Sequence, residues 1–302
     1  MNFTAIDIGG TFIKYANMDR NASILEKGKI STPQNWESFY ETLLFLAKKY
    51  PRQQGICISC PGLIDTKSGI CYHGGSLHFL HEKNLKKLLE NSLGIQTEIE
   101  NDAKCAGLAE ATLGNASHVQ DSIVIVLGTG IGGALIKNKR VLHGKHLMAG
   151  EFSYIIPSPS AVCEIAPALS PLLFREVSAK AIAEKVRLRK QLTSQTVTGE
   201  LVYQWAQEGD SVSRKVLSEF YISLAIQLAN LQHIFDPEII CIGGGISRAP
   251  HILEDIRIAV DNVYKSYSLK MEKPQIAACK FYNDSNMIGA LCHFLQQPPL
   301  QS

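Results

Sequence analysis

Three glycine-rich segments follow short apolar runs, and each could approach an anion through its backbone. They are Asp7-Ile8-Gly9-Gly10-Thr11, Gly128-Thr129-Gly130-Ile131-Gly132-Gly133 and Gly243-Gly244-Gly245. Glycine lets backbone N–H groups come close to phosphate oxygens, because no side chain stands in the way. A single turn of this kind is equally well explained as a hairpin that needs positive φ. Three of them together favour a phosphate-binding function.

None of the three turns matches a standard nucleotide motif. The sequence contains no G-x-x-x-x-G-K-[ST], so a P-loop is not predicted. None of the turns opens a helix after G-x-G-x-x-G, which disfavours a dinucleotide site. The second turn instead continues into a strand-like run at 134–137.

Asp102 is the acidic residue best placed to act as a general base. It lies in Glu100-Asn101-Asp102, between a strand-like stretch and a predicted helix at 103–113. Such a position faces the cleft in α/β folds, and a carboxylate within hydrogen-bond reach can accept the proton of a hydroxyl nucleophile. The alternative is that Asp102 only caps the helix. Beside three phosphate-binding turns, the catalytic role is the stronger interpretation.

The elements that would position these residues alternate between strands and helices, which indicates an α/β architecture. Apolar runs predict strands at 3–8, 12–18, 55–59, 97–100, 122–127, 134–137 and 238–242. Periodicity predicts helices at 36–49, 84–93, 103–113, 178–184, 199–208, 210–235, 250–265 and 286–296. The pattern of strand, Gly/Thr turn and strand occurs twice, which predicts an internally duplicated fold.

The composition is that of an ordinary globular protein. The chain has 302 residues, 45% of them hydrophobic, with a formal net charge of +2. This charge gives no reason to expect nucleic acid or an anionic membrane as a partner. No apolar stretch approaches the ~20 residues of a membrane span, and the first residues lack a signal-peptide pattern. We therefore expect a cytoplasmic protein.

Most of the eight cysteines stand inside apolar runs. Reduced cysteines in such runs usually behave as small hydrophobic residues. Cys57 and Cys60 have the spacing of a redox pair. However, they lie in a predicted strand rather than at the start of a helix, where a thiolate would be stabilised. Buried thiols are therefore the favoured interpretation.

Taken together, these segments resemble the ROK family of sugar kinases and repressors. Asp7–Thr11 with Lys14 resembles the first phosphate-binding hairpin of that family, and the segment 127–133 resembles the second. Glu100-Asn101-Asp102-Ala103 resembles its catalytic segment, and the segment 242–246 resembles the turn that approaches adenosine. The matches follow one another in the family's order, so the resemblance spans almost the whole chain.

The resemblance implies an α/β protein with the two-lobed, actin-like (ribonuclease H-like) ATPase fold and internally duplicated domains. One lobe would comprise residues 1–116 with a returning helix in 286–302, and the other residues 117–285. ATP and Mg²⁺ would be the cofactors, Asp7 would hold Mg²⁺ through water, and the protein would form a homodimer. The implied ATP-binding residues are Asp7, Gly9, Gly10, Thr11, Lys14, Gly128, Thr129, Gly130, Gly132, Gly244 and Gly245.

On the sugar side, the resemblance implies a pocket next to Asp102. The loop from Pro61-Gly62 to Gly74-Gly75-Ser76 resembles the family segment that lines the sugar. The implied sugar-binding residues are Gly62, Gly75, Ser76, Asn101, Asp102, Glu151 and Tyr154. Four of these binding assignments have an ordinary structural alternative. Asp7 would be a hairpin residue bonded to its own backbone, and Lys14 an exposed strand residue. Pro61-Gly62 would be a plain turn, and Glu151 a solvated loop carboxylate.

One segment departs from the family pattern. Many ROK proteins carry Gly-Glu-x-Gly-His followed by a cysteine cluster, and the histidine and cysteines bind structural zinc. Here Ser153 and Tyr154 replace the glycine and histidine, and only Cys163 follows. One cysteine cannot furnish a tetrahedral site, so no zinc is predicted. Nearby His143 and His146 are interpreted as loop residues. Tyr154 would reshape the pocket near sugar C1 and C2, favouring a β-glucoside or an N-acetylated hexosamine.

Three functions remain open at this stage. The first is an ATP-dependent kinase acting on the 6-hydroxyl of a hexose-type sugar such as glucose, a β-glucoside or N-acetylmannosamine. The second is a sugar-sensing transcriptional regulator of the same family, which would need a DNA-binding segment ahead of residue 1. The third is an actin-like ATPase or an acetate-kinase-like enzyme. The segment Glu100–Asp102 and Glu151 favour a polyhydroxy acceptor and therefore the sugar kinase.

Overall fold

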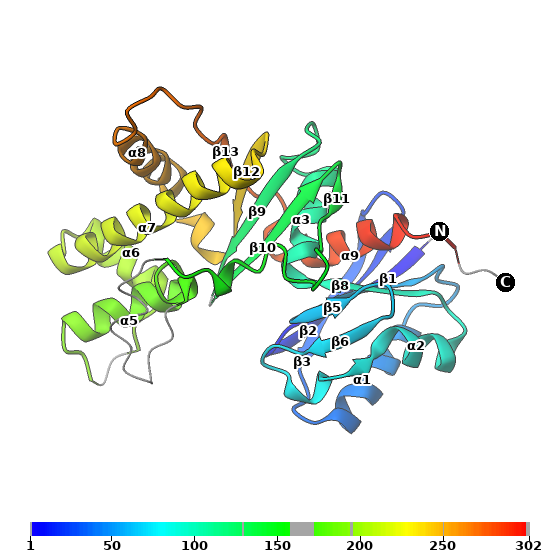
Figure 1. Ribbon diagram of the computed structural model, residues 1–302. Helices are drawn as coiled ribbons and strands as arrows, with labels where there is room; N and C mark the ends of the chain where they lie inside the picture. Colours follow the sequence, from blue (N-terminus) through cyan, green and yellow to red (C-terminus); the bar gives the residue numbers. More distant parts are fainter. Residues whose placement is uncertain (1, 129, 158–171, 194–195, 250, 300–302) are drawn as a thin grey trace.

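Two sheets of five strands form the framework of the described part of the chain (Figure 1). The computed structural model describes residues 2–128, 130–157, 172–193, 196–249 and 251–299. The first sheet consists of β1 (Asn2–Ile8), β2 (Phe12–Asp19), β3 (Ile24–Ser31), β4 (Ile56–Cys60) and β8 (Thr97–Asn101). The second consists of β9 (Ser122–Leu127), β10 (Ile131–Lys137), β11 (Arg140–Val141), β12 (Ile239–Gly243) and β13 (Ile276–Ala278).

The two sheets share one topology. Their strand orders are β3-β2-β1-β4-β8 and β11-β10-β9-β12-β13, so the same succession of antiparallel and then parallel neighbours occurs in both halves of the chain. This repetition confirms the predicted internal duplication. A third, smaller sheet of β5 (Leu63–Asp65), β6 (Ile70–His73) and β7 (Lys83–Asn84) extends from the first half.

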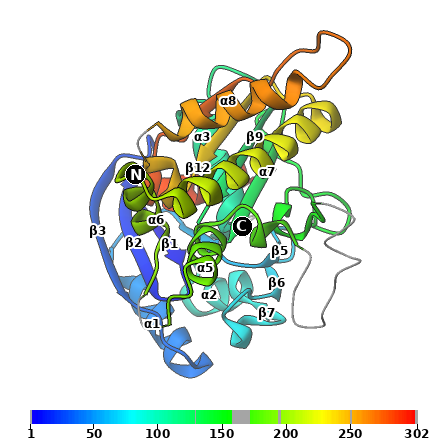
Figure 2. The same cartoon turned by 90° about the vertical axis from the view of Figure 1, so that its left-hand side faces the viewer.

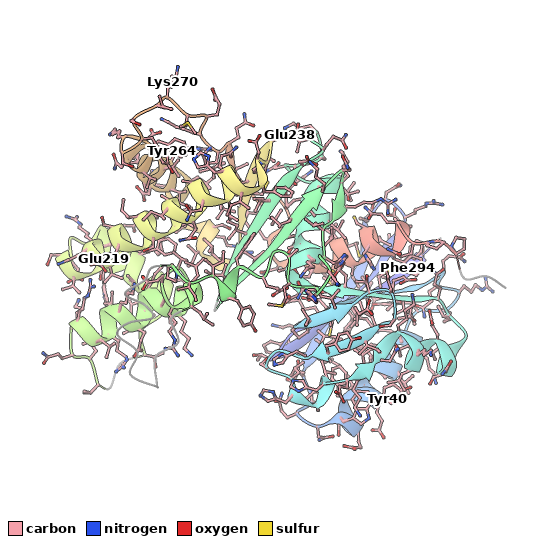
Figure 3. All side chains as sticks on the ribbon, in the orientation of Figure 1. Tyr40, Glu219, Glu238, Tyr264, Lys270 and Phe294 are labelled. Carbon is pink, nitrogen blue, oxygen red and sulfur yellow. The ribbon has the colours of Figure 1, made fainter. Side chains whose placement is uncertain are left out.

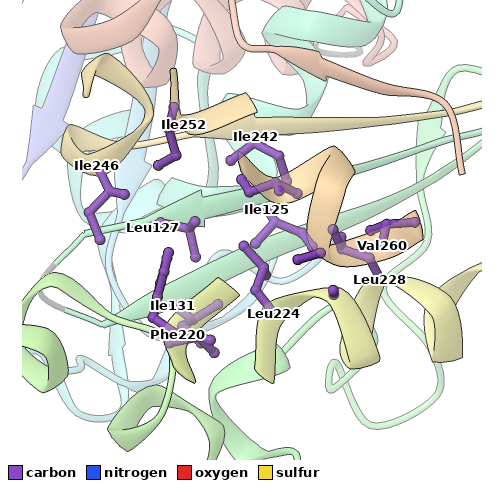
Figure 4. Packing of buried hydrophobic residues seen from close by; sticks show 14 of the residues in the cluster. Ile125, Leu127, Ile131, Phe220, Leu224, Leu228, Ile242, Ile246, Ile252 and Val260 are labelled. Carbon is purple, nitrogen blue, oxygen red and sulfur yellow. The ribbon is translucent and has the colours of Figure 1, made fainter. Parts of the chain in front are cut away.

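Helices cover the outer face of each sheet (Figures 1 and 2). Those of the first half are α1 (Trp36–Lys48) and α2 (Leu85–Leu93), and those of the second are α5 (Ala179–Arg189), α6 (Gly199–Gln207), α7 (Ser211–Phe235) and α8 (Ile252–Tyr264). In Figure 4, Leu224 and Leu228 of α7 approach Ile125 of β9, and all three are buried. Each such side chain contributes roughly 1.5–3 kcal/mol by leaving water.

Two further helices lie between the sheets (Figure 1). The helix α3 (Asp102–Leu113) packs on β9 and β10, whereas α9 (Ser285–Leu295) packs on β1, β4 and β8 of the first sheet. The helices α3 and α9 also contact each other. They lie so close together at Gly289 that a Cβ there would be 1.7 Å from the carbonyl oxygen of Cys105. Asp102 therefore begins a helix that joins the two halves.

The last helix packs on the first sheet. Phe294 of α9 points toward this sheet (Figure 3), and its ring centre lies 5.4 Å from that of Phe3 in β1. The division of the chain into one lobe of residues 1–116 and 286–302 and another of residues 117–285 stays a prediction.

Most predicted elements are present with shifted ends. Asn84 and Asp210 were predicted as helical, but each caps the helix that follows by accepting a backbone N–H bond. The helix predicted at 178–184 is longer and ends at Arg189. The strand β3 and the small sheet were not predicted. No helix in the described part of the chain has the length and apolar character that crossing a bilayer requires.

The cysteines behave as the sequence predicts. Cys57 and Cys60 lie in the buried strand β4, and the cysteines of the described residues have free thiols. Burial raises the pKa of the Cys57 thiol well above its usual range. A thiol with a raised pKa is a poor nucleophile, which supports a packing role. Cys163 lies outside the described residues.

Candidate active site

Asp102 is the first residue of α3, and its neighbour Asn101 is the residue that caps this helix. The Oδ1 atom of Asn101 accepts a hydrogen bond from the backbone N–H of Lys104 at 3.0 Å. Asp102 Oδ1 accepts from the N–H of Ala103 at 2.8 Å. Because Asn101 supplies the cap, the capping alternative does not account for Asp102. The Oδ2 atom of Asp102 has no hydrogen bond within the described ranges.

The environment of Asp102 raises its pKa from 3.8 to about 6. Burial of the carboxyl group is the main cause, and the negative charges of Asp7 and Glu151 act in the same direction. The Ala103 N–H and the Lys104 ammonium oppose this shift but do not cancel it. A carboxylate with a pKa near neutrality is suited to accept a proton at physiological pH.

Asp7 is buried at the end of β1 and is held by three other side chains. Its Oδ1 accepts hydrogen bonds from Ser59 Oγ at 2.9 Å and Asn286 Nδ2 at 3.0 Å. Its Oδ2 accepts from Lys14 Nζ at 3.2 Å. These partners come from β4, α9 and β2, so Asp7 is not a hairpin residue bonded to its own backbone. Oδ2 keeps one lone pair, which fits contact with a metal-bound water.

The first glycine turn joins β1 and β2. The N–H of Gly9 donates to the carbonyl of Phe12 at 3.0 Å, which closes the turn. Gly10 and Thr11 are exposed. A Cβ at Gly10 would lie 2.9 Å from Ser76 Oγ. The turn therefore offers accessible backbone next to a residue predicted to bind the sugar.

The second glycine turn lies between β9 and β10, at the start of α5. The N–H of Ala179 donates to the carbonyl of Gly128 at 2.9 Å. A helix N-terminus favours anions, and sequence analysis did not place one here. Gly132 lies inside β10, where a Cβ would be 2.6 Å from that of Ala103. Gly128 and Gly130 have no atom that would obstruct a Cβ, and Thr129 lies outside the described residues.

The third glycine turn follows β12. Gly244 has a φ of +88°, and a Cβ there would lie 2.2 Å from the carbonyl oxygen of Leu127. Gly245 faces open space. A cavity of about 150 Å³ is lined by Lys14, Gly244 and Asn286, among others. The third turn and Lys14, which lies in β2 after the first turn, thus line the same space.

The predicted sugar loop is tied to the start of α3. Asn101 Nδ2 donates to the carbonyl of Gly62 at 2.8 Å. Gly62 has a φ of +96° and lies against the backbone of His73, whose Nδ1 accepts from the N–H of Gly75 at 3.1 Å. Both polar ends of Asn101 are therefore engaged within the protein, and its position fixes the loop beside Asp102.

Glu151 also reaches α3, through a residue that sequence analysis did not select. Its Oε1 accepts from Lys104 Nζ at 2.5 Å, and the Lys104 side chain is 3% exposed. Glu151 is therefore not a solvated loop carboxylate. Tyr154 belongs to the short helix η2 (Phe152–Tyr154) and is 56% exposed, so it is not a packed core residue.

Comparison with known proteins matches this arrangement to one family. The sequence profile described as "ROK family" matches residues 3–297. The chain belongs to the ROK family. It is 31% identical over 300 residues to a beta-glucoside kinase of Klebsiella pneumoniae, with 98% of this chain and 97% of that protein covered.

Two further proteins support the assignment. A beta-glucoside kinase of Listeria monocytogenes is 31% identical over 307 residues, covering 98% of each chain. The crystal structure of a ROK family protein from Streptococcus pneumoniae in complex with sucrose has a TM-score of 0.87 and 31% identity, again covering 98% of each chain. The ROK chain described here therefore has the two-lobed actin-like fold.

This ROK chain contains a carboxylate–histidine cluster that sequence analysis missed. Glu100 has no exposed surface, and its Oε2 lies 2.7 Å from Nε2 of His143 and 3.6 Å from Nδ1 of His293. Burial pushes the Glu100 pKa upward, but the bond from His143, the histidine charges and the Asn101 N–H together hold it below its usual value. His143, interpreted from sequence as a loop residue, anchors its loop to β8.

Structural zinc remains a matter of prediction for this ROK chain. Within the described ranges, no three His, Cys, Asp or Glu side chains gather in a way that could hold a metal ion. Cys163, the one cysteine downstream of Tyr154 in the zinc segment, lies outside those ranges. Metal analysis of the purified protein tests the predicted absence of zinc.

Proposed function

We propose that this ROK chain is an ATP-dependent kinase that phosphorylates the 6-hydroxyl of a hexose-type sugar, with Asp102 as general base. The observation that carries the proposal is the setting of Asp102. It begins the helix between the two sheets, and its pKa of about 6 reflects burial and the charges of Asp7 and Glu151. The kinase activity of the curated relatives supports the same function.

The chemistry follows from these positions. The carboxylate of Asp102 takes the proton of the sugar hydroxyl, and the resulting oxygen forms a bond to the γ-phosphorus of ATP. The bond between that phosphorus and the bridging oxygen of ADP breaks, so ADP leaves. The backbone N–H groups of Gly10 and Thr11 are the proposed donors to the phosphates. When bound, Mg²⁺ neutralises phosphate charge, and Asp7 is the residue proposed to hold it through water.

Glu151 and Asn101 are proposed to orient the sugar. Lys104 occupies Oε1 of Glu151, so Oε2 is the atom left to accept from a sugar hydroxyl. Asn101 positions Gly62 and its loop, and Tyr154 offers an exposed phenol where other family members carry histidine. These features support a substituted hexose, either a β-glucoside or an N-acetylated hexosamine.

A coupled ADP-release assay tests this function. The panel is glucose, cellobiose, N-acetylmannosamine, N-acetylglucosamine, fructose and allose, with ATP and Mg²⁺ in excess. We expect ADP release to depend on one or more of the sugars, and mass spectrometry to locate the phosphate at C6. ADP release at the same rate without any sugar would identify an ATPase and contradict the proposal.

We also propose that the kinase acts as a homodimer in the cytoplasm. A groove of about 560 Å³ between α6, α7 and α8 is lined by Tyr203, Tyr221, Ile222 and Ile258, among others. Ile258 is 52% exposed, and a second copy of the chain would cover it. Light scattering should give twice the chain mass, and Ile258→Asp should give one chain mass. A monomeric wild type would contradict the dimer.

A further inference from the structure

Two histidines of the loop between β11 and η2 have different surroundings. His146 is exposed, and its side chain has no hydrogen bond or ion pair among the described residues. The Nε2 atom of His143 lies 2.7 Å from Oε2 of Glu100, whose side chain has no exposed surface. His143 therefore connects this loop to a buried carboxylate that has no role in the chemistry above.

The hydrogen bond between His143 and Glu100 has a defined direction. Although burial pushes the pKa of Glu100 upward, the bond from His143 and the neighbouring charges hold it below its usual value, so the carboxyl group is ionised at neutral pH. An ionised carboxylate only accepts hydrogen bonds, so Nε2 of His143 is the donor. A buried carboxylate that loses a partner is costly. The fold therefore favours one position of the His143 ring.

A second histidine approaches the same carboxylate but does not replace His143. Nδ1 of His293, in α9, lies 3.6 Å from Oε2 of Glu100. Burial is the main cause that lowers the pKa of His293, so this ring is neutral at pH 7. The separation of 3.6 Å exceeds that of an ordinary hydrogen bond. His143 is thus the closer of the two histidine partners of Oε2.

The Glu100–His143 bond joins the two sheets next to the proposed site. Glu100 lies in β8 of the first sheet, and its Oε1 accepts from the N–H of Asn101 at 2.7 Å. Asp102 follows at once. His143 comes from the loop after β11, which belongs to the second sheet. The bond therefore fixes this loop relative to the end of the strand that leads into the proposed general base.

The loop closes on itself between His143 and Glu151. The carbonyl of His143 accepts from the N–H of Ala149 at 3.2 Å, only two residues before Glu151. The Glu151 carboxylate then accepts from Lys104 Nζ in α3. The segment 143–151 is thus bonded at both ends to the β8–α3 segment. A displacement of His143 would move the carboxylate that is proposed to bind the sugar.

We propose that Glu100 and His143 are positioning residues for the sugar, because their hydrogen bond holds the loop so that Glu151 meets the substrate beside Asp102. Glu100 has no exposed surface, so it acts through its neighbours rather than by contact with the sugar. This inference rests on the proposed kinase function and adds a specific requirement to it. Glu151 is proposed to bind the sugar and not ATP, so loss of the bond should weaken sugar binding selectively.

The test separates binding of the sugar from binding of ATP. Values of kcat and of KM for each substrate are measured by ADP release, with the sugar of the assay panel that wild type phosphorylates fastest. His143→Ala removes the donor to Glu100, whereas His143→Gln keeps an amide N–H near the position of Nε2. His146→Ala is the matched control, because it removes the other histidine of the same loop. Thermal melting checks that each variant is folded.

We expect His143→Ala to raise the KM for the sugar about tenfold, with the KM for ATP within about twofold and kcat within about threefold of wild type. His143→Gln should restore the KM for the sugar to within about threefold of wild type, and His146→Ala should match wild type. If His143→Ala does not fold, His143→Asn takes its place, because its amide is too short to reach Glu100. The same rise of about tenfold in the KM for the sugar is then expected.

Three results would overturn the positioning role while leaving the kinase function intact. The first is a folded His143→Ala or His143→Asn protein with the wild-type KM for the sugar. The second is an equal rise in the KM for the sugar and for ATP, which would show a general loosening of the fold. The third is a His143→Gln protein as impaired as His143→Ala. Wild type that releases ADP at the same rate without any sugar would overturn the kinase function itself, and the positioning role with it.

Discussion

Replacing Asp102 with asparagine should make the protein more stable and almost inactive. Asparagine keeps the oxygen that accepts from Ala103 N–H but has no negative charge. The pKa rise from 3.8 to about 6 means that the folded protein disfavours the ionised carboxylate. At 1.36 kcal/mol per pKa unit, removing this charge is worth about 3 kcal/mol at pH 7.5.

Asp102→Asn also removes a stabilising interaction, but the resulting loss of stability is smaller than the gain. A negative charge in the first turn of a helix is favourable by about 0.3–1 kcal/mol, and Asp102→Asn loses this contribution. The net expectation is a gain of about 2 kcal/mol, or a rise in Tm of about 4–8 °C. The sign depends on pH. The penalty exists only where Asp102 is ionised in the fold, so the gain should fade between about pH 6 and pH 4, where wild type becomes protonated.

Differential scanning calorimetry and the ADP-release assay provide the two measurements. Loss of the general base should lower kcat about 10²–10⁴-fold while the KM for ATP stays within about twofold. Asn101→Ala is the control for stability, because removing the true cap should cost about 0.5–2 kcal/mol. A destabilised Asp102→Asn protein, or one that retains full turnover, would refute the reasoning.

Three further expectations concern the same site. The kcat/KM of wild type should be half-maximal at about pH 6 and fall toward lower pH as Asp102 becomes protonated. A kcat/KM that stays constant from pH 5 to pH 8 would exclude Asp102 as the base. Gly244→Ala should raise the KM for ATP about tenfold, because the φ of +88° at Gly244 and its contact with Leu127 leave no room for a methyl group. An unchanged KM would show that this turn does not bind the nucleotide. Glu151→Gln should lower the free energy of unfolding, measured by urea titration, by about 2–3 kcal/mol, because the buried Lys104 loses its charged partner. A loss below about 0.5 kcal/mol would show that this pair behaves as a surface ion pair.

The strands and helices that the sequence predicts well are the buried ones. Strands β4, β9 and β12 are continuous apolar runs, and α7 repeats its apolar residues at helical spacing. The strand β3 was missed because its segment, ILEKGKIS, is mostly exposed and rich in charge. Charged residues are typical of a strand at the edge of a sheet. The strands of the small sheet have two to four residues, too few to show a period.

The candidate site was only partly predictable, for a related reason. Glycine turns and Asp102 are evident because residue type alone limits what they can do. The contacts that fix them join distant parts of the chain. Asn286 donates to Asp7 across 279 positions, and Lys104 pairs with Glu151 across 47. The complete burial of Glu100 was also hidden, because glutamate is normally exposed and its histidine partners come from a later loop and from α9.

A crystal structure with cellobiose and a non-hydrolysable ATP analogue tests the central claim most directly. We predict the C6 hydroxyl of one glucose ring within about 2.6–3.2 Å of an Asp102 carboxylate oxygen, with the terminal phosphates against the turns at Gly10 and Gly128. A complex in which the carboxylate of Asp102 points away from every sugar hydroxyl, or in which the phosphates bind elsewhere, would contradict the account.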